Sequence, residues 1–218
     1  MQLREVLRFR ATISSMRGRA LAKAKQILAK SGCKSCFNNV MSKRARLWLQ
    51  NVSLYEFRRL EVDYLIKLYD NYSLELQKLD KRLEYYQHKY PEVDILISVP
   101  GISTFSALMI LAEVDDIMRF ETPDKLASYA GLTPSLYQSG NTKNHGQITK
   151  QGSGWLRWIL TQCTQASLKT KKSHRLKKFF NRIAKKRGKQ KAIIATARKM
   201  LVVIWHLLDK NEYYATRN

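Results

Sequence analysis

One serine in this 218-residue chain stands where a hydroxyl group could react with bound phosphate. Ser139 lies between Gln138 and Gly140, directly before residues 141–208, which contain seventeen Lys and Arg and no Asp or Glu. A hydroxyl is a weak nucleophile at neutral pH unless a base, a metal or nearby charge assists it. Cations also stabilise the negative charge that develops on a phosphodiester under attack. These residue types therefore point to chemistry on phosphate.

Several residues near Ser139 are candidates to assist that chemistry. The predicted phosphate-binding residues around it are Gly140, Lys143, Lys150 and Arg157. His145 is a candidate proton acceptor, and Ser135 and Ser153 are competing hydroxyls. From the residues alone, Ser139 is also typical of a turn, because Gln-Ser-Gly is ordinary loop composition.

The charge of the chain is uneven along its length. The formal net charge of +23 is made up of +11 in residues 1–53, −5 in residues 54–140 and +17 in residues 141–218. A large field of one sign needs a polyanionic partner, and nucleic acid is the usual one. A basic run is commonly a solvated surface, but no acid balances this one over residues 141–208. We therefore expect the two basic arms to bind DNA.

Disulfides and a bound metal are not expected for this chain. Cys33 and Cys36 form an isolated C-x-x-C pair, and Cys163 stands alone. A zinc site would need further ligands at suitable spacing. The histidines, none paired at that spacing, are His88, His145, His174 and His206. We expect reduced thiols, and Asp115 and Asp116 fit a solvated helix end better than a metal site.

Targeting signals are also missing from the sequence. No apolar window approaches the length of a membrane span. The N-terminus leads into a charged helix and not into the apolar segment of a signal peptide. These features predict a cytoplasmic protein without a membrane partner.

The spacing of apolar residues predicts a mainly α-helical fold. Residues 2–30 have helical periodicity with a basic exposed face. In residues 53–90 the predicted coiled-coil positions are Val62, Tyr69, Leu76 and Leu83, with Leu65, Tyr72, Leu79 and Tyr86 three places later. Two partners for this seam remain open. One is a second copy, which gives a homo-oligomer, and the other is a helix from residues 2–50 in an antiparallel hairpin.

Residues 94–114 are predicted to form a helix, a tight turn at 99–103 and a second helix. This is the helix-hairpin-helix pattern, in which the turn amides and the start of the second helix point at a DNA phosphate. Gly101 and Ser103 are therefore predicted to contact DNA. A plain helix hairpin packed in a core fits the same pattern.

Residues 131–154 are the one long non-helical region predicted, either a loop or a small β-hairpin pairing 136–138 with 147–149. Thr122 and Pro123 predict the start of the helix that precedes it. Further helices are predicted over 155–168, 175–186 and 190–208, with a basic corner between the last two. The nucleic-acid contacts predicted there are Lys185, Lys186, Arg187, Lys189, Lys191 and Arg198. The three tryptophans expected in the core are Trp155, Trp158 and Trp205.

An ordered set of motifs resembles the C-terminal transposase domain of the insertion-sequence 110 family (IS110/IS116/IS902-type transposases). The motifs lie at residues 99–102, 120, 126–134, 138–140, 146–152, 156–157 and 188–201. The resemblance spans residues 95–213, and residues 1–90 resemble the helical linker and coiled coil that precede this domain. It implies three parts: a basic helical segment at 1–52, a coiled-coil helix at 53–90 and the transposase domain at 91–218.

The resemblance implies a DNA recombinase guided by a structured RNA of the element. The serine of the family's Gln-Ser-Gly motif attacks a DNA phosphate, and that role falls on Ser139. The family also has a domain whose four carboxylates bind divalent metal, which implies Mg²⁺. This sequence shows no such domain, so the metal and its carboxylates are expected from elsewhere. The alternatives are a truncated, non-catalytic binder of element DNA or RNA and a general helix-hairpin-helix repair module.

Overall fold

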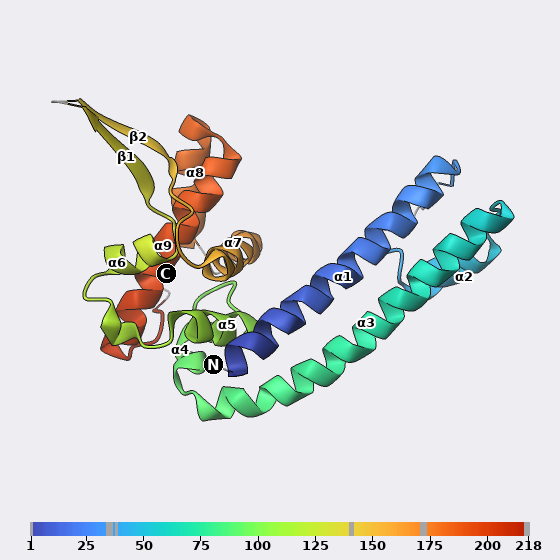
Figure 1. The fold of residues 1–218 in the computed structure, drawn as a ribbon, viewed down its shortest axis with the longest axis horizontal. Helices are drawn as coiled ribbons and strands as arrows, with labels where there is room; N and C mark the ends of the chain where they lie inside the picture. The colour runs from blue at the N-terminus through green and yellow to red at the C-terminus, as the bar shows by residue number, and fades with distance from the viewer. Residues whose placement is uncertain (1, 34–36, 38, 140–141, 171–173, 216–218) are drawn as a thin grey trace. The chain divides into compact units, whose positions relative to one another are not determined.

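The fold is described from a computed structural model, which places residues 2–33, 37, 39–139, 142–170 and 174–215. Most of these residues are helical, which confirms the mainly α prediction (Figure 1). The chain divides into two compact units. Unit 1 contains residues 1–8 and 82–218, and unit 2 contains residues 9–81. The three-part division expected from the resemblance stays a prediction.

Unit 2 is an antiparallel arrangement of two long helices with a short one between them. Helix α1 (Gln2–Lys30) and helix α3 (Glu56–Lys89) both continue into unit 1. The guanidinium of Arg10 bonds the Asp80 carboxylate at 2.9 Å, and the start of α3 meets the end of α1, where Val62 joins Ile27 and Leu28 in one apolar cluster. Because Val62 belongs to the predicted coiled-coil seam, this packing favours the hairpin within one molecule.

Helix α2 (Lys43–Asn51) lies in the predicted basic helical segment 1–52 but was not predicted as a separate helix. The hydroxyl of Ser42 caps it by accepting a hydrogen bond from the amide of Ala45. Arg46 makes two hydrogen bonds to the Asp70 carboxylate of α3, at 2.9 and 2.5 Å. The helix has only nine residues, and Ala45 and Leu49 are its buried side chains, so its periodic signal is short.

Unit 1 packs helices around one large apolar core. After the ends of α1 and α3 its elements are α4 (Glu92–Ile97), α5 (Thr104–Val114), the 3₁₀ turn η1 (Ile117–Arg119), α6 (Pro123–Tyr129), strands β1 (Pro134–Ser139) and β2 (Thr142–Ile148), and helices α7 (Gly154–Lys169), α8 (His174–Arg187) and α9 (Lys189–Lys210). Helix α9 packs against α6, α7 and α8. Leu126, Leu160 and Ile204 are fully buried in this core. Trp155 and Trp205 pack against it as predicted, whereas Trp158 is 37% exposed.

Local signals in the sequence set several of these boundaries. Thr122 caps α6 through the amide of Lys125, and Pro123 occupies the first helical position, as predicted. Asp116 caps η1 through the amide of Met118, and both Asp115 and Asp116 are exposed, as expected for a solvated helix end. These contacts are local, so the sequence alone reveals them.

Candidate active site

Ser139 is the last residue of β1, at the closing end of an antiparallel β-hairpin. Its partner is Thr142, and the two residues between them, Gly140 and Asn141, lie outside the described residues. In Figure 1 the hairpin projects beyond the helices of unit 1. The structure describes the backbone, but not the side chains, of residues 136–139 and 142–145. The backbone therefore presents Ser139 at the tip of the hairpin.

The hairpin register differs from the predicted one. Leu136 pairs with His145 and Gln138 pairs with Lys143, so residues 136–138 face 143–145 and not 147–149. The pairing places Lys143 next to the Ser139–Thr142 pair. The backbone of His145 lies three residues along β2 from Thr142, which is about 10 Å in a strand. The hairpin by itself therefore does not bring His145 to Ser139.

The other end of the hairpin is anchored in a segment that we call the hairpin root, residues 129–133 and 149–153. The amide of Thr149 bonds the carbonyl of Thr133 at 2.9 Å, and the amide of Ser153 bonds the carbonyl of Tyr129 at 3.0 Å. A Cβ on Gly131 would lie 2.4 Å from the carbonyl oxygen of Gln151, and one on Gly152 would lie 2.0 Å from that of Tyr129. Both glycines have positive φ, so only glycine fits this close approach.

Lys150 and Arg157 lie at this root, at the opposite end of the hairpin from Ser139. Lys150 is exposed and has φ 55°, a left-handed conformation that few lysines adopt. Arg157 is half-buried and donates from its guanidinium to the carbonyl of Ala130 at 2.9 Å. The predicted phosphate clamps are therefore not gathered around Ser139; Arg157 braces the root.

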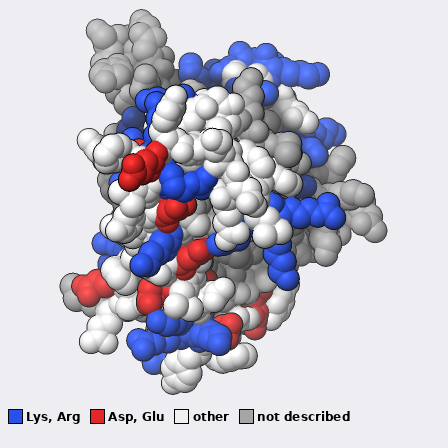
Figure 2. Space-filling model, turned by 90° about the vertical axis from the view of Figure 1, so that its right-hand side faces the viewer, with Lys and Arg blue, Asp and Glu red and all other residues white. Residues whose placement is uncertain are grey.

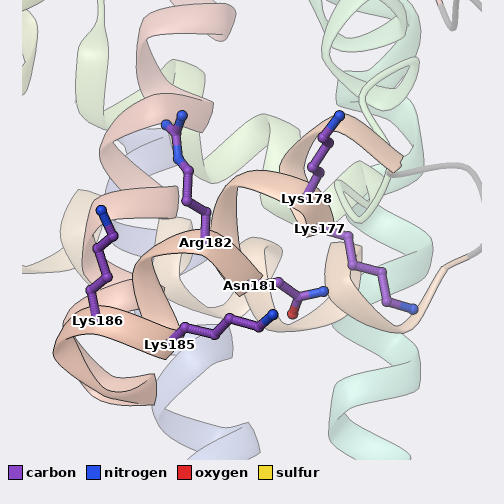
Figure 3. A pocket seen from close by; sticks show the side chains of 6 residues that line it. All are labelled: Lys177, Lys178, Asn181, Arg182, Lys185 and Lys186. Atoms are coloured by element: carbon purple, nitrogen blue, oxygen red, sulfur yellow. The ribbon is translucent and has the colours of Figure 1, made fainter.

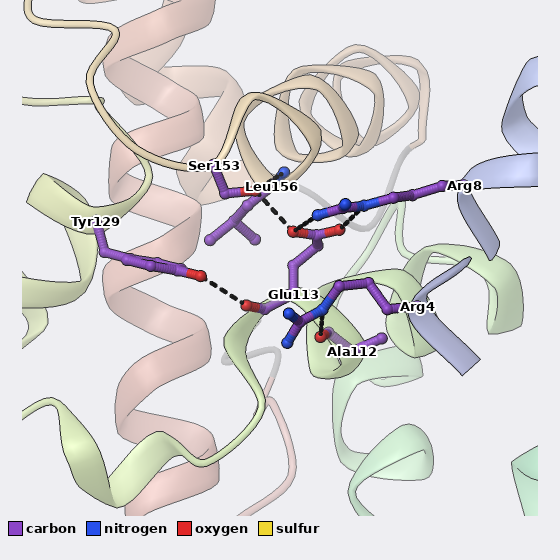
Figure 4. Close-up of polar contacts among 7 residues, drawn as sticks. All are labelled: Arg4, Arg8, Ala112, Glu113, Tyr129, Ser153 and Leu156. Atoms are coloured by element: carbon purple, nitrogen blue, oxygen red, sulfur yellow. Dashed lines mark hydrogen bonds and ion pairs between the residues drawn. The ribbon is translucent and has the colours of Figure 1, made fainter. Parts of the chain in front are cut away.

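A buried carboxylate that the sequence analysis missed ties the root to helix α1 (Figure 4). The side chain of Glu113, at the end of α5, is 1% exposed and accepts two hydrogen bonds from Arg8, at 2.7 and 2.9 Å. The hydroxyl of Ser153 donates to the same carboxylate at 2.7 Å and also caps α7 by accepting from the amide of Leu156. The Tyr129 hydroxyl donates to the backbone carbonyl of Glu113.

The environment of Glu113 keeps it ionised. Burial raises the pKa of Glu113, but the hydrogen bonds from Arg8 and Ser153 outweigh burial, so its pKa lies below the ordinary value. The pKa of Arg8 is raised, chiefly by the hydrogen bond to Glu113. A signal was present in the sequence, because Glu113 is the one charged residue in the otherwise apolar and neutral helix α5. Because burying an unpaired charge costs free energy, a single charged residue in such a helix indicates a partner of opposite charge in the core.

The remaining predicted contacts fall into two groups. Lys185, Lys186 and Arg187 end α8, Gly188 turns the chain with φ 82°, and Lys189 begins α9. All of these side chains, and that of Lys191, are exposed, so the basic corner is present as predicted. Arg198 differs, because it forms an ion pair with Asp124 at 2.9 Å.

The two helices and the tight turn predicted at residues 94–114 are present, but the turn packs against helix α7 of the same protein. A Cβ on Gly101 would lie 2.4 Å from the amide nitrogen of Ser167 and 2.6 Å from the carbonyl oxygen of Cys163, both in α7. Ser103 is exposed and caps α5 by accepting from the amide of Ser106. The close approach of Gly101 to α7 explains the glycine by packing. DNA contact by Gly101 and Ser103 stays a prediction.

The described thiols are free, and the described acids and histidines do not form a metal cluster. Cys33 is half-buried and Cys163 is buried. Burial raises the pKa of Cys163 to about 11, so it is not a thiolate nucleophile at neutral pH. Among the described residues, no three His, Cys, Asp or Glu side chains are placed to hold a metal ion. Cys36 lies outside the described residues. No described helix is both long and apolar enough to traverse a bilayer.

Comparison with known proteins gives a consistent result. The transposase for insertion sequence element IS1111A of Coxiella burnetii is 34% identical over 119 residues, 54% of this chain and 33% of that protein. The insertion element IS110 uncharacterized 43.6 kDa protein of Streptomyces coelicolor is 28% identical over 130 residues, 59% of this chain and 31% of that protein. The pilin gene-inverting protein of Moraxella bovis is 27% identical over 153 residues, 67% of this chain and 47% of that protein.

The matched region covers less than half the length of each of these three relatives. A family model described as Transposase IS116/IS110/IS902 family matches residues 93–181, from α4 to the middle of α8. That range contains the β-hairpin with Ser139, the hairpin root and Glu113. Residues 93–181 therefore match the Transposase IS116/IS110/IS902 family, and the relatives above point to the same family.

Proposed function

We propose that this chain supplies the nucleophilic serine of a DNA recombinase that moves an insertion element. The observation that carries the proposal is the position of Ser139 in a Gln-Ser-Gly sequence at the tip of an anchored hairpin, inside the matched domain. Relatives named as transposases, and one named as a pilin gene-inverting protein, support an activity that rearranges DNA. The acid-free basic residues 141–208 supply positive charge for a polyanionic substrate.

The proposed reaction is a transesterification at phosphorus. The Ser139 hydroxyl gives its proton to a base, its oxygen forms a bond to a DNA phosphorus, and the bond from that phosphorus to a deoxyribose oxygen breaks. The released deoxyribose oxygen takes up a proton. The hydroxyl of another strand then attacks the phosphoserine, which rejoins DNA and restores Ser139. The net number of phosphodiester bonds is unchanged, so no external energy source is needed.

Among the described residues, no group of three or more His, Cys, Asp or Glu is placed to hold a divalent metal. We propose that carboxylates from another protein part hold Mg²⁺ beside the hairpin tip, and that a structured RNA selects the DNA target. A serine presented on a projecting hairpin is suited to such a composite site, because its backbone is not enclosed by the helices of its own unit (Figure 1).

Ser139→Ala tests the nucleophile directly. The assay supplies labelled element-end DNA, Mg²⁺ and the carboxylate-bearing part of a relative, and detects DNA linked covalently to this chain. We expect the adduct with the unchanged chain and with the control Ser135→Ala, but none with Ser139→Ala. An adduct that persists in Ser139→Ala would reject Ser139. If no variant forms an adduct while all still bind DNA, the chain is a non-catalytic nucleic-acid binder.

A further inference from the structure

The outer face of α8 carries a hollow lined by cations (Figure 3). The hollow has a volume of about 570 Å³, and its described lining residues are Lys177, Lys178, Asn181, Arg182, Lys185 and Lys186. All six are exposed. The opposite side of the helix buries Leu176 and half-buries Phe179 and Ile183, so the helix is strongly amphipathic and its orientation is determined. We call these six residues the α8 groove.

The α8 groove has no internal counter-charge. Within the part of the chain that the structure describes, none of its five cations forms an ion pair with Asp or Glu. On other helices some cations are paired with acids, as in Arg46–Asp70, Lys78–Glu75 and Arg198–Asp124. Figure 2, which is viewed from the side where α1 ends and α3 begins, shows some acidic side chains next to basic ones. The α8 groove therefore gathers five cations on one helix face without an acidic partner among the described residues.

Helix stability does not account for these cations. Basic residues in the last turn, such as Lys185 and Lys186, interact favourably with the helix dipole. Lys177 and Lys178 lie near the other end of α8, where no acid is present in the first turn and a cation opposes the dipole. Lys178, Arg182 and Lys186 also follow one another at intervals of four residues, a spacing at which like charges repel. A bound polyanion removes both penalties.

The shape and chemistry of the groove select the kind of polyanion. Small-molecule pockets are lined mainly by apolar side chains, and here the described lining contains none. The lining residues span about 14 Å of helix, enough for roughly four phosphates of one nucleic-acid strand. Four of the five cations are lysines, which bind phosphate as point charges, whereas paired carboxylates are matched best by the planar arginine fork. The spacing thus suits a phosphodiester backbone better than an acidic peptide.

We propose that the α8 groove binds the phosphodiester backbone of a nucleic-acid strand without reading its bases. Contacts to phosphate fix position and carry no sequence information directly. The site extends the predicted basic corner by Lys177, Lys178, Asn181 and Arg182, none of which the sequence analysis selected. It rests on the proposed function only for the choice of nucleic acid as the polyanion, and it does not need Ser139 to react. DNA and RNA share this backbone chemistry, so the experiment must separate them.

The test compares two triple variants of the full chain that lose equal charge. Lys178→Gln, Arg182→Gln and Lys186→Gln together remove three positive charges that follow one another along the α8 groove. The control combines Lys67→Gln, Lys81→Gln and Lys89→Gln on α3, which are exposed residues outside the groove. Binding to a DNA duplex and to a single-stranded RNA, both of unrelated sequence, is measured over a series of salt concentrations. Circular dichroism checks that both variants keep their helices.

For the groove variant we expect weaker binding and a log-log salt slope that is less steep by about 2.7 on duplex DNA, or about 2.1 on single-stranded RNA. The control should change the log-log salt slope by less than about 0.9 on duplex DNA, which is the value for one phosphate contact. A loss on only one probe identifies that nucleic acid as the ligand. The proposal is overturned if both variants lose binding equally or if neither does.

The two proposals fail separately. If the chain forms no serine adduct but the groove variant still binds nucleic acid more weakly than the control variant, the α8 site is retained and catalysis is not. A chain that forms the Ser139 adduct but shows no difference between the variants retains the chemistry without this site.

Discussion

At the scale of single residues, Glu113 is the most consequential side chain that the sequence analysis did not select. It joins Arg8 of α1 and Ser153 of the hairpin root through one buried carboxylate. Buried ion pairs do not generally add stability over an apolar core, but removing one partner leaves the other unsatisfied. Glu113 therefore holds the root in one arrangement, and its loss should be costly.

Glu113→Gln should lower the free energy of unfolding by about 1–3 kcal/mol at pH 7, because Arg8 and Ser153 lose a charged acceptor. The pKa of Glu113 is lowered by folding, so its contribution is complete above its unfolded value of about 4.5. The contribution disappears as the pH falls through the lowered folded value. Urea titrations of both proteins at pH 7 and pH 3.5 measure the difference.

The control is Glu121→Gln, whose carboxylate pairs with Lys125 at the surface. It should unfold like the unchanged protein at pH 7. The free energies of unfolding of Glu113→Gln and the unchanged protein should differ less at pH 3.5 than at pH 7. An equal difference at both pH values contradicts the role assigned to the ionised carboxylate.

Gly152→Ala should disrupt the hairpin root. The new Cβ would lie 2.0 Å from the Tyr129 carbonyl oxygen, and the residue has φ 97°. We expect a loss of about 2–3 kcal/mol in the free energy of unfolding, from the clash and from strain. Gly18→Ala is the matched control, because nothing lies within 4 Å of its Cβ position inside helix α1. It should gain about 0.5–1 kcal/mol, so equal effects in thermal unfolding would contradict the structure.

At the scale of elements, the apolar spacing in α3 predicted a helix with a buried seam but did not say which helix covers that seam. The predicted seam residue Val62 is 1% exposed and packs with α1 of the same chain. A different set of large side chains on and beside α3 is exposed, and we call it the α3 apolar stripe: Tyr55, Phe57, Leu60, Tyr64 and Leu68. Homo-oligomer formation through the seam stays a prediction, and the stripe is a second candidate surface.

We propose that the α3 apolar stripe pairs with a second copy of the chain. Aromatic side chains bury about 150–250 Å² each, so the stripe offers roughly 600 Å² per copy. That is somewhat below the ~800 Å² per partner of a typical specific interface, which predicts a weak dimer. Leu60→Glu with Tyr64→Glu should give a monomer in light scattering across protein concentrations. Leu76→Glu, at a buried seam position, should instead impair folding.

An unchanged chain that stays monomeric at all concentrations would rule out pairing through the stripe. A dimer that survives the double substitution would place the interface elsewhere.

At the scale of the whole molecule, each unit has its own apolar cluster. Leu160 lies in the cluster of unit 1 and Leu49 in that of unit 2. Either substitution to Ala should cost about 2–5 kcal/mol in a well-packed core. Hydrogen exchange should therefore increase mainly within unit 1 for Leu160→Ala and within unit 2 for Leu49→Ala. Equal increases throughout the chain in both variants would mean that the two units unfold as one.

The sequence by itself determined the features that depend on neighbouring residues. Helical periodicity, the Thr122–Pro123 cap, the glycine-rich hairpin segment and the uneven charge are all local, because caps, turns and side-chain periods act over a few residues. The motifs that resemble the transposase family are local too. They were placed at residues 95–213, and the family model matches residues 93–181, which contain most of them.

The tertiary structure alone decided which distant residues meet. It separated Ser139 at the hairpin tip from Arg157 at the root, and it paired Glu113 with Arg8, 105 residues away in the chain. It also packed Val62 of the predicted seam against α1, and it left the basic side chains of the α8 groove exposed. Such pairings depend on how whole helices pack, because no spacing within one segment states which other segment will cover it.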